Sequence, residues 1–302
     1  MPVTIPPYLR KGQTIGLVCT AGFMPAERVQ HCTEQLAAWG LQVQVGDTIG
    51  HQHHYFAGTD AERLADLQQM LDNPEVHAIL CARGGYGTSR IIDQVNWRRF
   101  KKHPKWIIGF SDVTVLHSYL YTRLHIASMH APMAAAFLPD NRDEASLQSL
   151  KAALFGKATA YKLNTHPFNR PGQATGPLLG GNLSLLTHQV GTPSDINTRG
   201  AILFIEDVGE YLYNIDRMLL QLDRAGKLAN LAGLVVGGFT EGKDTTVGFG
   251  ATVEEIIAQR VSKYSFPVCF GFPVSHGQQN VCLKTGCTYQ IKVGRQVTLK
   301  EV

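Results

Sequence analysis

The sequence predicts an α/β protein with a doubly wound parallel sheet, followed by a smaller domain of mixed α/β structure. Short apolar runs alternate with helical periodicity through about residue 155. The pattern then loosens into a polar stretch with proline and glycine, and strand and helix patterns resume after it. We therefore expect a first domain over residues 1–155, a linker over 156–175 and a C-terminal domain over 176–302. A chain of 302 residues accommodates two domains of ordinary size.

The elements of the first domain follow from the spacing of its apolar side chains. Apolar runs without helical periodicity predict buried parallel strands, and apolar residues three or four positions apart predict helices. The expected strands cover residues 14–20, 41–45, 76–82, 106–108 and 126–133. The expected helices cover residues 25–40, 61–71, 90–95, 112–124 and 144–155.

The second half of the chain predicts a similar but shorter series of elements. The linker contains one expected strand, residues 159–163. Further strands are expected at residues 201–205, 231–237 and 268–274, and a terminal hairpin at 288–293 and 296–301. Helices are expected at residues 180–190, 214–223 and 252–261.

Composition and charge exclude several classes of function. Hydrophobic residues make up 44% of the chain and charged residues 17%, and the net charge is only +4. The one basic cluster has no interleaved aromatic residues of the kind that stack on bases, so we interpret it as a solvated face and expect no nucleic-acid partner. This cluster consists of Arg98, Arg99, Lys101, Lys102 and Lys105.

The sequence also indicates the compartment in which the protein works. It shows neither a signal peptide nor an apolar run of the ~20 residues that span a bilayer, so we expect no membrane association. Six cysteines lie in apolar surroundings without a C-x-x-C pair. Buried, reduced thiols in a cytoplasmic protein are the simplest explanation.

Two turns in the first domain are candidates for a functional site. Ser111 lies between an apolar strand and a helical pattern, and Gly84-Gly85 follows a neighbouring strand. Because ligands bind at the carboxyl ends of parallel strands, the two turns are expected to meet at one edge of the sheet. Ser111 is either a helix N-cap alone or a nucleophile that also caps its helix.

Two residues of the second domain complete a possible catalytic set. Glu206 and His276 each follow an expected strand, and a nucleophilic serine needs a base that a carboxylate orients. Both residues also have ordinary interpretations, as a loop acid and a turn histidine. His130 is the rival base, whereas His117 lies within a helix. The histidines at 51, 53 and 54 lack a carboxylate or cysteine at ligand spacing, so no metal site and no cofactor are expected.

Five ordered motifs resemble those of the LD-carboxypeptidase family of serine peptidases. Together they extend over nearly the whole chain, which makes the resemblance far more specific than any one motif. The motifs are Arg83-Gly84-Gly85-Tyr86-Gly87, Gly109-Phe110-Ser111-Asp112-Val113-Thr114, Gly180-Gly181-Asn182-Leu183-Ser184, Leu203-Phe204-Ile205-Glu206-Asp207-Val208-Gly209-Glu210 and Gly271-Phe272-Pro273-Val274-Ser275-His276-Gly277.

The resemblance implies a flavodoxin-like first domain carrying Ser111 and a C-terminal domain carrying Glu206 and His276 across a cleft. These three residues would form the catalytic triad. The implied oxyanion donors are the backbone N–H groups of Asp112 and of the Gly84-Gly85 turn, with Gly85 as the expected donor there.

The implied substrate is the cytoplasmic murein tetrapeptide, cut between meso-diaminopimelate and terminal D-alanine during peptidoglycan recycling. The enzyme is expected to be a homodimer. Arg83, Gly84 and Tyr86 are candidate substrate-binding residues, although Arg83 equally suits a pairing with a structural acid.

Two departures from the family pattern and two alternative functions stay open at this point. Ser275 stands where the family has glycine, and Lys284 stands where the family often has proline. We expect the first departure to affect turn geometry and the second to affect substrate contacts at most.

The alternative functions are a family member that hydrolyses peptidyl-nucleotide antibiotics for self-immunity, and a non-catalytic flavodoxin-like binding protein. Only Phe239 and Phe249 lie between Asp223 and Val261 as aromatic residues that could stack on a nucleobase.

Overall fold

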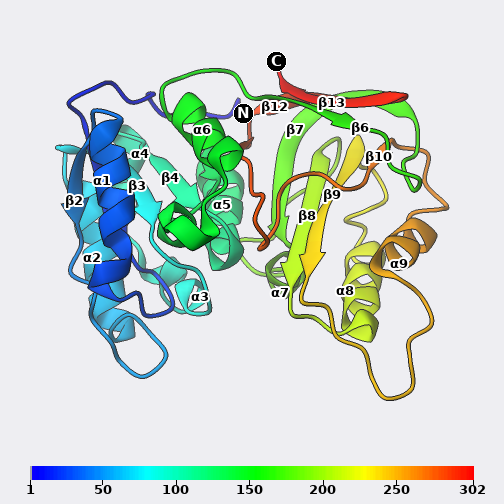
Figure 1. The fold of residues 1–302 in the computed structure, drawn as a ribbon, viewed down its shortest axis with the longest axis horizontal. Coiled ribbons are helices and arrows are strands. Elements are labelled where there is room, and N and C mark those ends of the chain that lie inside the picture. Colours follow the sequence, from blue (N-terminus) through cyan, green and yellow to red (C-terminus); the bar gives the residue numbers. More distant parts are fainter. Residues whose placement is uncertain (1) are drawn as a thin grey trace.

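The computed structural model describes residues 2–302 and contains two sheets lying side by side (Figure 1). The first sheet has the strand order β11-β5-β4-β3-β1-β2. Neighbouring strands among β1 to β5 pair in parallel, and β11 is antiparallel to β5. Its strands are β1 (Thr14–Val18), β2 (Gln42–Val45), β3 (Val76–Cys81), β4 (Trp106–Gly109), β5 (Ser128–His130) and β11 (Leu283–Thr285).

Both faces of the first sheet are covered, as the doubly wound prediction requires. Successive side chains of a strand point to opposite faces, so Ile107 packs into one apolar cluster and Ile108 into another. The covering helices are α1 (Gln30–Ala38), α2 (Asp60–Asp72), α3 (Thr88–Ile91), α4 (Arg98–Lys102), α5 (Thr114–Tyr119) and α6 (Glu144–Leu154). Short 3-10 helices are η1 (Ala26–Val29), η2 (Ile92–Gln94), η3 (Ser111–Val113), η5 (Ala134–Phe137) and η6 (Pro139–Asn141), and η4 (Leu120–Leu124) is a π-helical turn.

The second sheet combines a parallel half with an antiparallel half. Its order is β10-β9-β8-β7-β12-β13-β6, with parallel pairing from β10 to β7 and antiparallel pairing from β7 to β6. The strands are β6 (Ala160–Asn164), β7 (Gly172–Asn182), β8 (Ile202–Val208), β9 (Gly233–Thr240), β10 (Val268–Cys269), β12 (Thr288–Val293) and β13 (Gln296–Glu301). The helices of this half are α7 (Leu183–His188), α8 (Leu212–Arg224) and α9 (Val253–Arg260).

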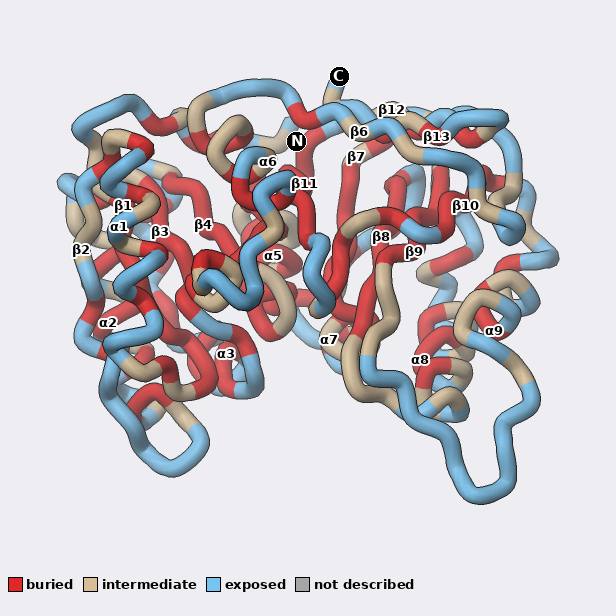
Figure 2. Tube along the Cα trace, viewed as in Figure 1, coloured by how far each residue is buried: buried red, intermediate tan, exposed pale blue. Residues whose placement is uncertain are grey.

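The predicted fold class, a doubly wound sheet followed by a smaller α/β unit, is confirmed. Figure 2 shows the inner strands β1, β3, β4 and β8 mostly buried, whereas the segment between β9 and α9 is exposed throughout residues 241–250. All six cysteines are buried and free, as expected. Among residues 2–302, no helix has the length and apolar character needed to cross a bilayer.

Several expected strand boundaries are wrong, and these errors concern the second half most. β8 continues through Glu206 to Val208, and its register with β9 shifts between Ile205 and Asp207. Only two residues of the expected strand 268–274 pair, and residues 270–282 have no regular structure. The expected linker holds β6 and the first residues of β7, both of which pair in the second sheet.

The C-terminal half also contributes a strand to the first sheet. β11 pairs with β5 beside the strand that leads to Ser111. Lys284, on β11, is fully buried, and its ammonium donates to the Tyr8 hydroxyl at 3.0 Å and pairs with Glu301 at 3.0 Å. The Lys284 ammonium is therefore held by contacts inside the protein.

Candidate active site

Ser111 sits at a sharp turn directly after β4. Its φ of 62° lies in the left-handed region that a residue with a Cβ seldom adopts. No side-chain hydrogen bond caps η3 or α5, so the capping interpretation of Ser111 is wrong. A strained residue between a strand and a helix projects its side chain beyond the sheet, as nucleophilic serines require.

The glycine turn after β3 lies directly against Ser111, as the sequence predicted. A Cβ added at Gly84 would lie 2.8 Å from the Ser111 Cβ, 2.9 Å from its Oγ and 3.5 Å from the backbone nitrogen of Asp112. The next residue, Gly85, has a φ of 106°. Asp112 occupies the second position of η3, where a backbone N–H has no acceptor within the helix. Both expected oxyanion donors therefore belong to segments that meet at the serine.

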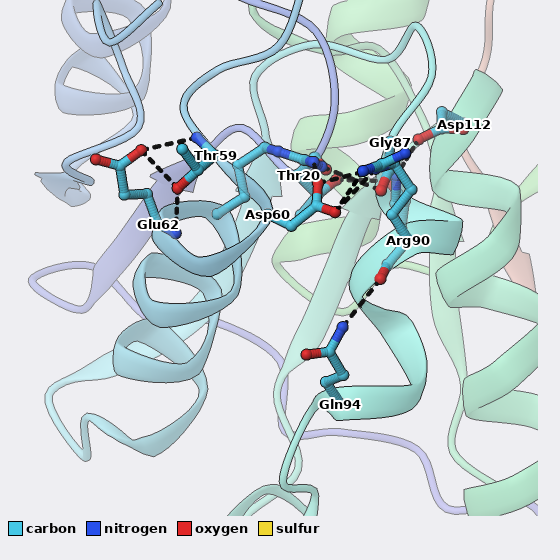
Figure 3. Close-up of polar contacts among 10 residues, drawn as sticks. Thr20, Thr59, Asp60, Glu62, Gly87, Arg90, Gln94 and Asp112 are labelled. Carbon is cyan, nitrogen blue, oxygen red and sulfur yellow. Dashed lines mark hydrogen bonds and ion pairs between the residues drawn. The ribbon is translucent and has the colours of Figure 1, made fainter. Parts of the chain in front are cut away.

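A polar network holds Gly87 and Thr88, the residues that follow this glycine turn (Figure 3). The Asp112 carboxylate accepts a hydrogen bond from the backbone N–H of Thr88 at 2.8 Å, which ties the turn to η3. Burial raises the pKa of Asp112, and the hydrogen bonds from Thr88 oppose this effect. The guanidinium of the fully buried Arg63 donates to the backbone oxygen of Gly87 at 3.0 Å and also contacts Asp60. Asp60 in turn holds Arg90 at 2.7 Å.

His276 and Glu206 are hydrogen-bonded next to Phe110, the residue that precedes Ser111. The Nδ1 atom of His276 lies 2.7 Å from Oε2 of Glu206, whose side chain is fully buried. Burial by itself lowers the pKa of His276, but the hydrogen bond and charge of Glu206 outweigh it and raise that pKa. The ring of Phe110, the residue before Ser111, stacks edge-on against the His276 ring at 4.8 Å.

The other ring nitrogen of His276 is free to act on a neighbouring group. Within residues 2–302, His276 Nε2 is buried and has no hydrogen-bond partner. The structure thus contains the histidine–carboxylate half of the expected triad, while the serine approaches from the other half of the chain without a hydrogen bond to His276. Catalytic hydrogen bonds are often long without substrate and tighten when it binds.

Ser275 explains how the turn before His276 forms without the glycine of the family pattern. Its hydroxyl donates to the backbone oxygen of Gln279 at 2.9 Å and accepts from the backbone N–H of Gly277 at 3.0 Å. The Ser275 Cβ packs on Gly238, where a further Cβ would lie at 2.6 Å. The departure therefore changes how the turn is held and leaves His276 in place.

The third motif joins the two halves of the chain close to the serine. A Cβ at Gly181 would lie 2.4 Å from Thr114 Oγ1, so only glycine permits this approach between β7 and α5. The backbone N–H of Asn182 donates to the same hydroxyl at 3.1 Å. Asn182 also donates to Asp207 at 2.7 Å, and burial raises the pKa of Asp207 to about 6.

Two cavities flank the Ser111 turn. The first, of about 250 Å³, brings Arg83 and Phe110 together with His276 and Asn280. The second, of about 460 Å³, is lined by Gly85, Tyr86 and Asp112 together with residues of α7 and residues 192–194. Side chains from both halves of the chain line each cavity, so a bound ligand would contact both halves.

The candidate substrate-binding residues take different places around these cavities. Arg83 lines the first cavity, and its guanidinium donates to the backbone oxygen of Phe23 and pairs with no acid among the described residues. Tyr86 is half exposed and lines the second cavity. Gly84 is buried against Ser111.

The rival base His130 is unsuited to proton transfer at Ser111. Its Nε2 lies 3.0 Å from the Asn280 amide oxygen, and complete burial lowers its pKa to about 3. His117 bonds to Ser128 at 2.8 Å and to the backbone oxygen of Gly109 at 2.9 Å, and burial lowers its pKa to about 4. Neither histidine can serve as a base that titrates near neutrality.

Sequence reasoning missed Phe110 and Asn280, which support the histidine. Phe110 packs on the ring of His276, and Asn280 connects the segment that carries His276 to His130 on β5. Phe110 lies inside a recognised motif, but no periodicity or spacing distinguishes Asn280.

Within the described part of the chain, no group of three or more His, Cys, Asp and Glu side chains is arranged to hold a metal ion.

Comparisons with known proteins agree with this architecture. Residues 15–131 match the LD-carboxypeptidase N-terminal domain, and residues 175–291 match the LD-carboxypeptidase C-terminal domain. A probable murein peptide carboxypeptidase of Bacillus subtilis is 35% identical over 98% of this chain and 94% of its own length. The chain therefore belongs to the LD-carboxypeptidase family and is a serine-type carboxypeptidase.

Two solved structures share the whole fold. The crystal structure of muramoyltetrapeptide carboxypeptidase from Oxalobacter formigenes has a TM-score of 0.88 and 29% identity, covering 96% of this chain and 98% of that one. The microcin C7 self immunity protein MccF has a TM-score of 0.87 at 23% identity, covering 99% of this chain and 98% of that one. At that identity, the likeness to MccF concerns the fold alone.

Proposed function

We propose that this protein is a carboxypeptidase that releases terminal D-alanine from L,D-configured murein tetrapeptides during peptidoglycan recycling in the cytoplasm. The observation that carries the proposal is the contact of the buried Glu206 with His276, whose Nε2 has no partner within residues 2–302, together with the strained Ser111. The relatives named for murein peptides support the substrate class. As the family resemblance implies, we expect the enzyme to act as a homodimer, in the cleft between its two domains.

The chemistry proceeds by acyl transfer. The Glu206 carboxylate accepts a hydrogen bond from the Nδ1–H group of His276, which leaves the unprotonated Nε2 as the base that takes the Ser111 proton. Ser111 attacks the carbonyl at the L-centre of meso-diaminopimelate, and the backbone N–H groups of Gly85 and Asp112 stabilise the oxyanion. Each such donor is worth about 3 kcal/mol in related chemistry. His276 then protonates the departing amine of D-alanine, and water hydrolyses the acyl-enzyme.

Positive charge close to the triad suits the terminal carboxylate of the substrate. Arg83 shares the first cavity with His276, so we propose that its guanidinium binds this carboxylate. We propose that Tyr86, which lines the second cavity, and the backbone of Gly84 contact the peptide on the other side of Ser111. We also propose domains over residues 1–155 and 176–302, joined by a segment, residues 156–175, whose strand β6 and first residues of β7 pair with the second sheet.

The decisive experiment compares Ser111→Ala with the wild-type enzyme on a synthetic murein tetrapeptide. We expect D-alanine release, measured by chromatography, to fall by at least about 10³-fold, since loss of the nucleophile removes the covalent route. Ser265→Ala changes an exposed serine that makes no side-chain hydrogen bond in the described structure and serves as the control. Near-normal turnover by a folded Ser111→Ala enzyme would contradict the proposed triad.

The substrates of the alternative functions separate them in the same assay. A peptidase for peptidyl-nucleotides would cleave such a compound faster than the tetrapeptide, yet neither Phe239 nor Phe249 lines a cavity beside Ser111. A binding protein would cleave neither compound. A fluorophosphonate that labels the wild type but not Ser111→Ala would exclude that alternative as well.

A further inference from the structure

A third cavity, of about 570 Å³, lies at the opposite end of the first sheet from Ser111. Residues just before β1 and β4 and at the start of β3 contribute to it, whereas Ser111 follows the end of β4. Its volume is typical of small-molecule sites. Its lining consists of Pro7, Gln13, Leu71, Asp72, Pro74, Val76, His77, Arg99, Lys102, His103, Pro104 and Lys105.

All four cations of helix α4 are exposed, and two of them also line this cavity. Arg99 and Lys102, three positions apart and hence on one face of the helix, line the cavity. Arg98 and Lys101 do not line it. Within residues 2–302, the side chains of Arg99 and Lys102 make no hydrogen bond or ion pair, so both are available to a ligand. Figure 1 shows α4 at the end of the sheet opposite to α3, which follows the glycine turn.

Lys105 adds a buried donor to these two cations. Its residue is only 6% exposed, and its ammonium donates to the backbone oxygens of Met70, at 2.9 Å, and Asn73. An ammonium has three N–H donors, so one remains after these two bonds. Burial lowers the pKa of Lys105 to about 8, against the opposing charge of Asp72. An anion in the cavity would offset this cost.

The remaining lining determines what kind of anion fits. Leu71 and Val76 are buried apolar residues, and prolines 7, 74 and 104 extend this apolar surface. Asp72 is the one acid in the lining, against the three cations of Arg99, Lys102 and Lys105. Apolar walls with cations on one side match a ligand that has an anionic head and an apolar body.

We propose that this cavity binds an amphipathic anion, a carboxylate or phosphate monoester that carries an apolar group. Arg99, Lys102 and Lys105 hold the head group, and Leu71 and Val76 contact the apolar body. The basic cluster that the sequence identified as a solvated face is therefore divided: Arg98 and Lys101 face solvent, and Arg99, Lys102 and Lys105 form a binding site.

Calorimetric titration of the full-length protein tests this proposal with four probes: octyl phosphate, octanoate, inorganic phosphate and octanol. We expect one octyl anion to bind per chain, and both the bare phosphate and the neutral alcohol to bind at least about tenfold more weakly. The affinity of octyl phosphate, compared with that of octanoate, identifies the preferred head group. If neither octyl anion binds at about 10 mM, the proposal is overturned, because a specific ligand site binds more tightly than this. Equal binding of octanol would also overturn it.

Two double variants with the same charge change provide the matched comparison. We expect Arg99→Gln with Lys102→Gln to weaken binding of the octyl anion about tenfold or more, and Arg98→Gln with Lys101→Gln to change it less than about twofold. Equal weakening would mean that net charge alone attracts the anion and would overturn the site. The Ser111→Ala enzyme should bind the probe as the wild type does, so this test stands apart from that of the catalytic proposal.

Discussion

The Nδ1 atom of His276 lies 2.7 Å from Oε2 of Glu206, although 70 positions separate the two residues in the chain. Glu206 is fully buried and, within residues 2–302, its other carboxylate oxygen has no partner. A buried carboxylate in this position favours the histidine tautomer with the proton on Nδ1. The Nε2 lone pair then points away from Glu206 and is available for the proton of a nucleophile.

Glu206→Gln should preserve the shape of this pair and remove its charge. Because an amide can donate to Nδ1 as well as accept from it, the wrong tautomer becomes populated, and we expect kcat to fall by about 10³- to 10⁴-fold. Steady-state D-alanine release measures the effect. Glu75→Gln, at an exposed position, is the control. A folded Glu206→Gln enzyme with more than a tenth of wild-type kcat would contradict this role of Glu206.

The raised pKa of His276 predicts the acid limb of the pH profile. The base must be neutral, so kcat/KM should rise with pH through the pKa of His276 in the free enzyme. Since Glu206 holds that pKa above the ordinary value of 6.5, the limb should have its midpoint above pH 6.5. In Glu206→Gln the residual activity should have its midpoint at lower pH. A wild-type midpoint below 6.5 would exclude His276 as the titrating base.

Gly84→Ala tests whether the glycine turn positions the nucleophile. The added methyl group would lie 2.8 Å from the Ser111 Cβ and 2.9 Å from its Oγ, so the serine must move. Displacements of this size cost roughly 10²-fold in rate, and we expect at least that loss in kcat. Gly242→Ala is the control, because its added Cβ meets nothing within 4 Å. Equal activity of the two variants would show that the turn tolerates the shift.

The sequence located the turn at Ser111 better than it located the segments that carry Glu206 and His276. Ser111 was placed correctly between a strand and a helix because the apolar run and the helical period are local signals. No local pattern records its left-handed backbone or the close approach of Gly84. The local preference of serine for helix N-caps also predicts a cap at Ser111, where the structure has no side-chain cap.

The errors in the second half have a common physical cause. Glu206 lies inside β8 because β9 continues beside it after a register shift, and pairing with a distant strand cannot be read from residues 201–208. His276 lies in an irregular segment that is held by side-chain contacts, such as that of Asn280 with His130. β11 is three residues long and pairs with a strand more than 150 positions earlier. Tertiary contacts decided each of these positions.

Buried histidines also give the stability of the protein a pH dependence. His117 and His130 titrate near 6.5 in the unfolded chain, but burial lowers their pKa values to about 4 and about 3 in the folded protein. Below pH 6.5 the unfolded state therefore binds protons that the folded state excludes. The free energy of unfolding falls as the pH falls through this range, by up to about 1.4 kcal/mol per pH unit for each histidine.

His130→Gln should reduce this acid sensitivity without abolishing it. The variant loses a group that must protonate on unfolding, so between pH 6 and 4.5 its free energy of unfolding should fall with a slope smaller by about 1 kcal/mol per pH unit. Urea titrations at several pH values measure both slopes. His31→Gln, at a half-exposed residue, should keep the wild-type slope. An amide at position 130 can still donate to the Asn280 oxygen. A general loss of stability in the variant would lower its free energy of unfolding equally at every pH and would leave the slope unchanged. Equal slopes in the two variants would show that His130 protonates in the folded state.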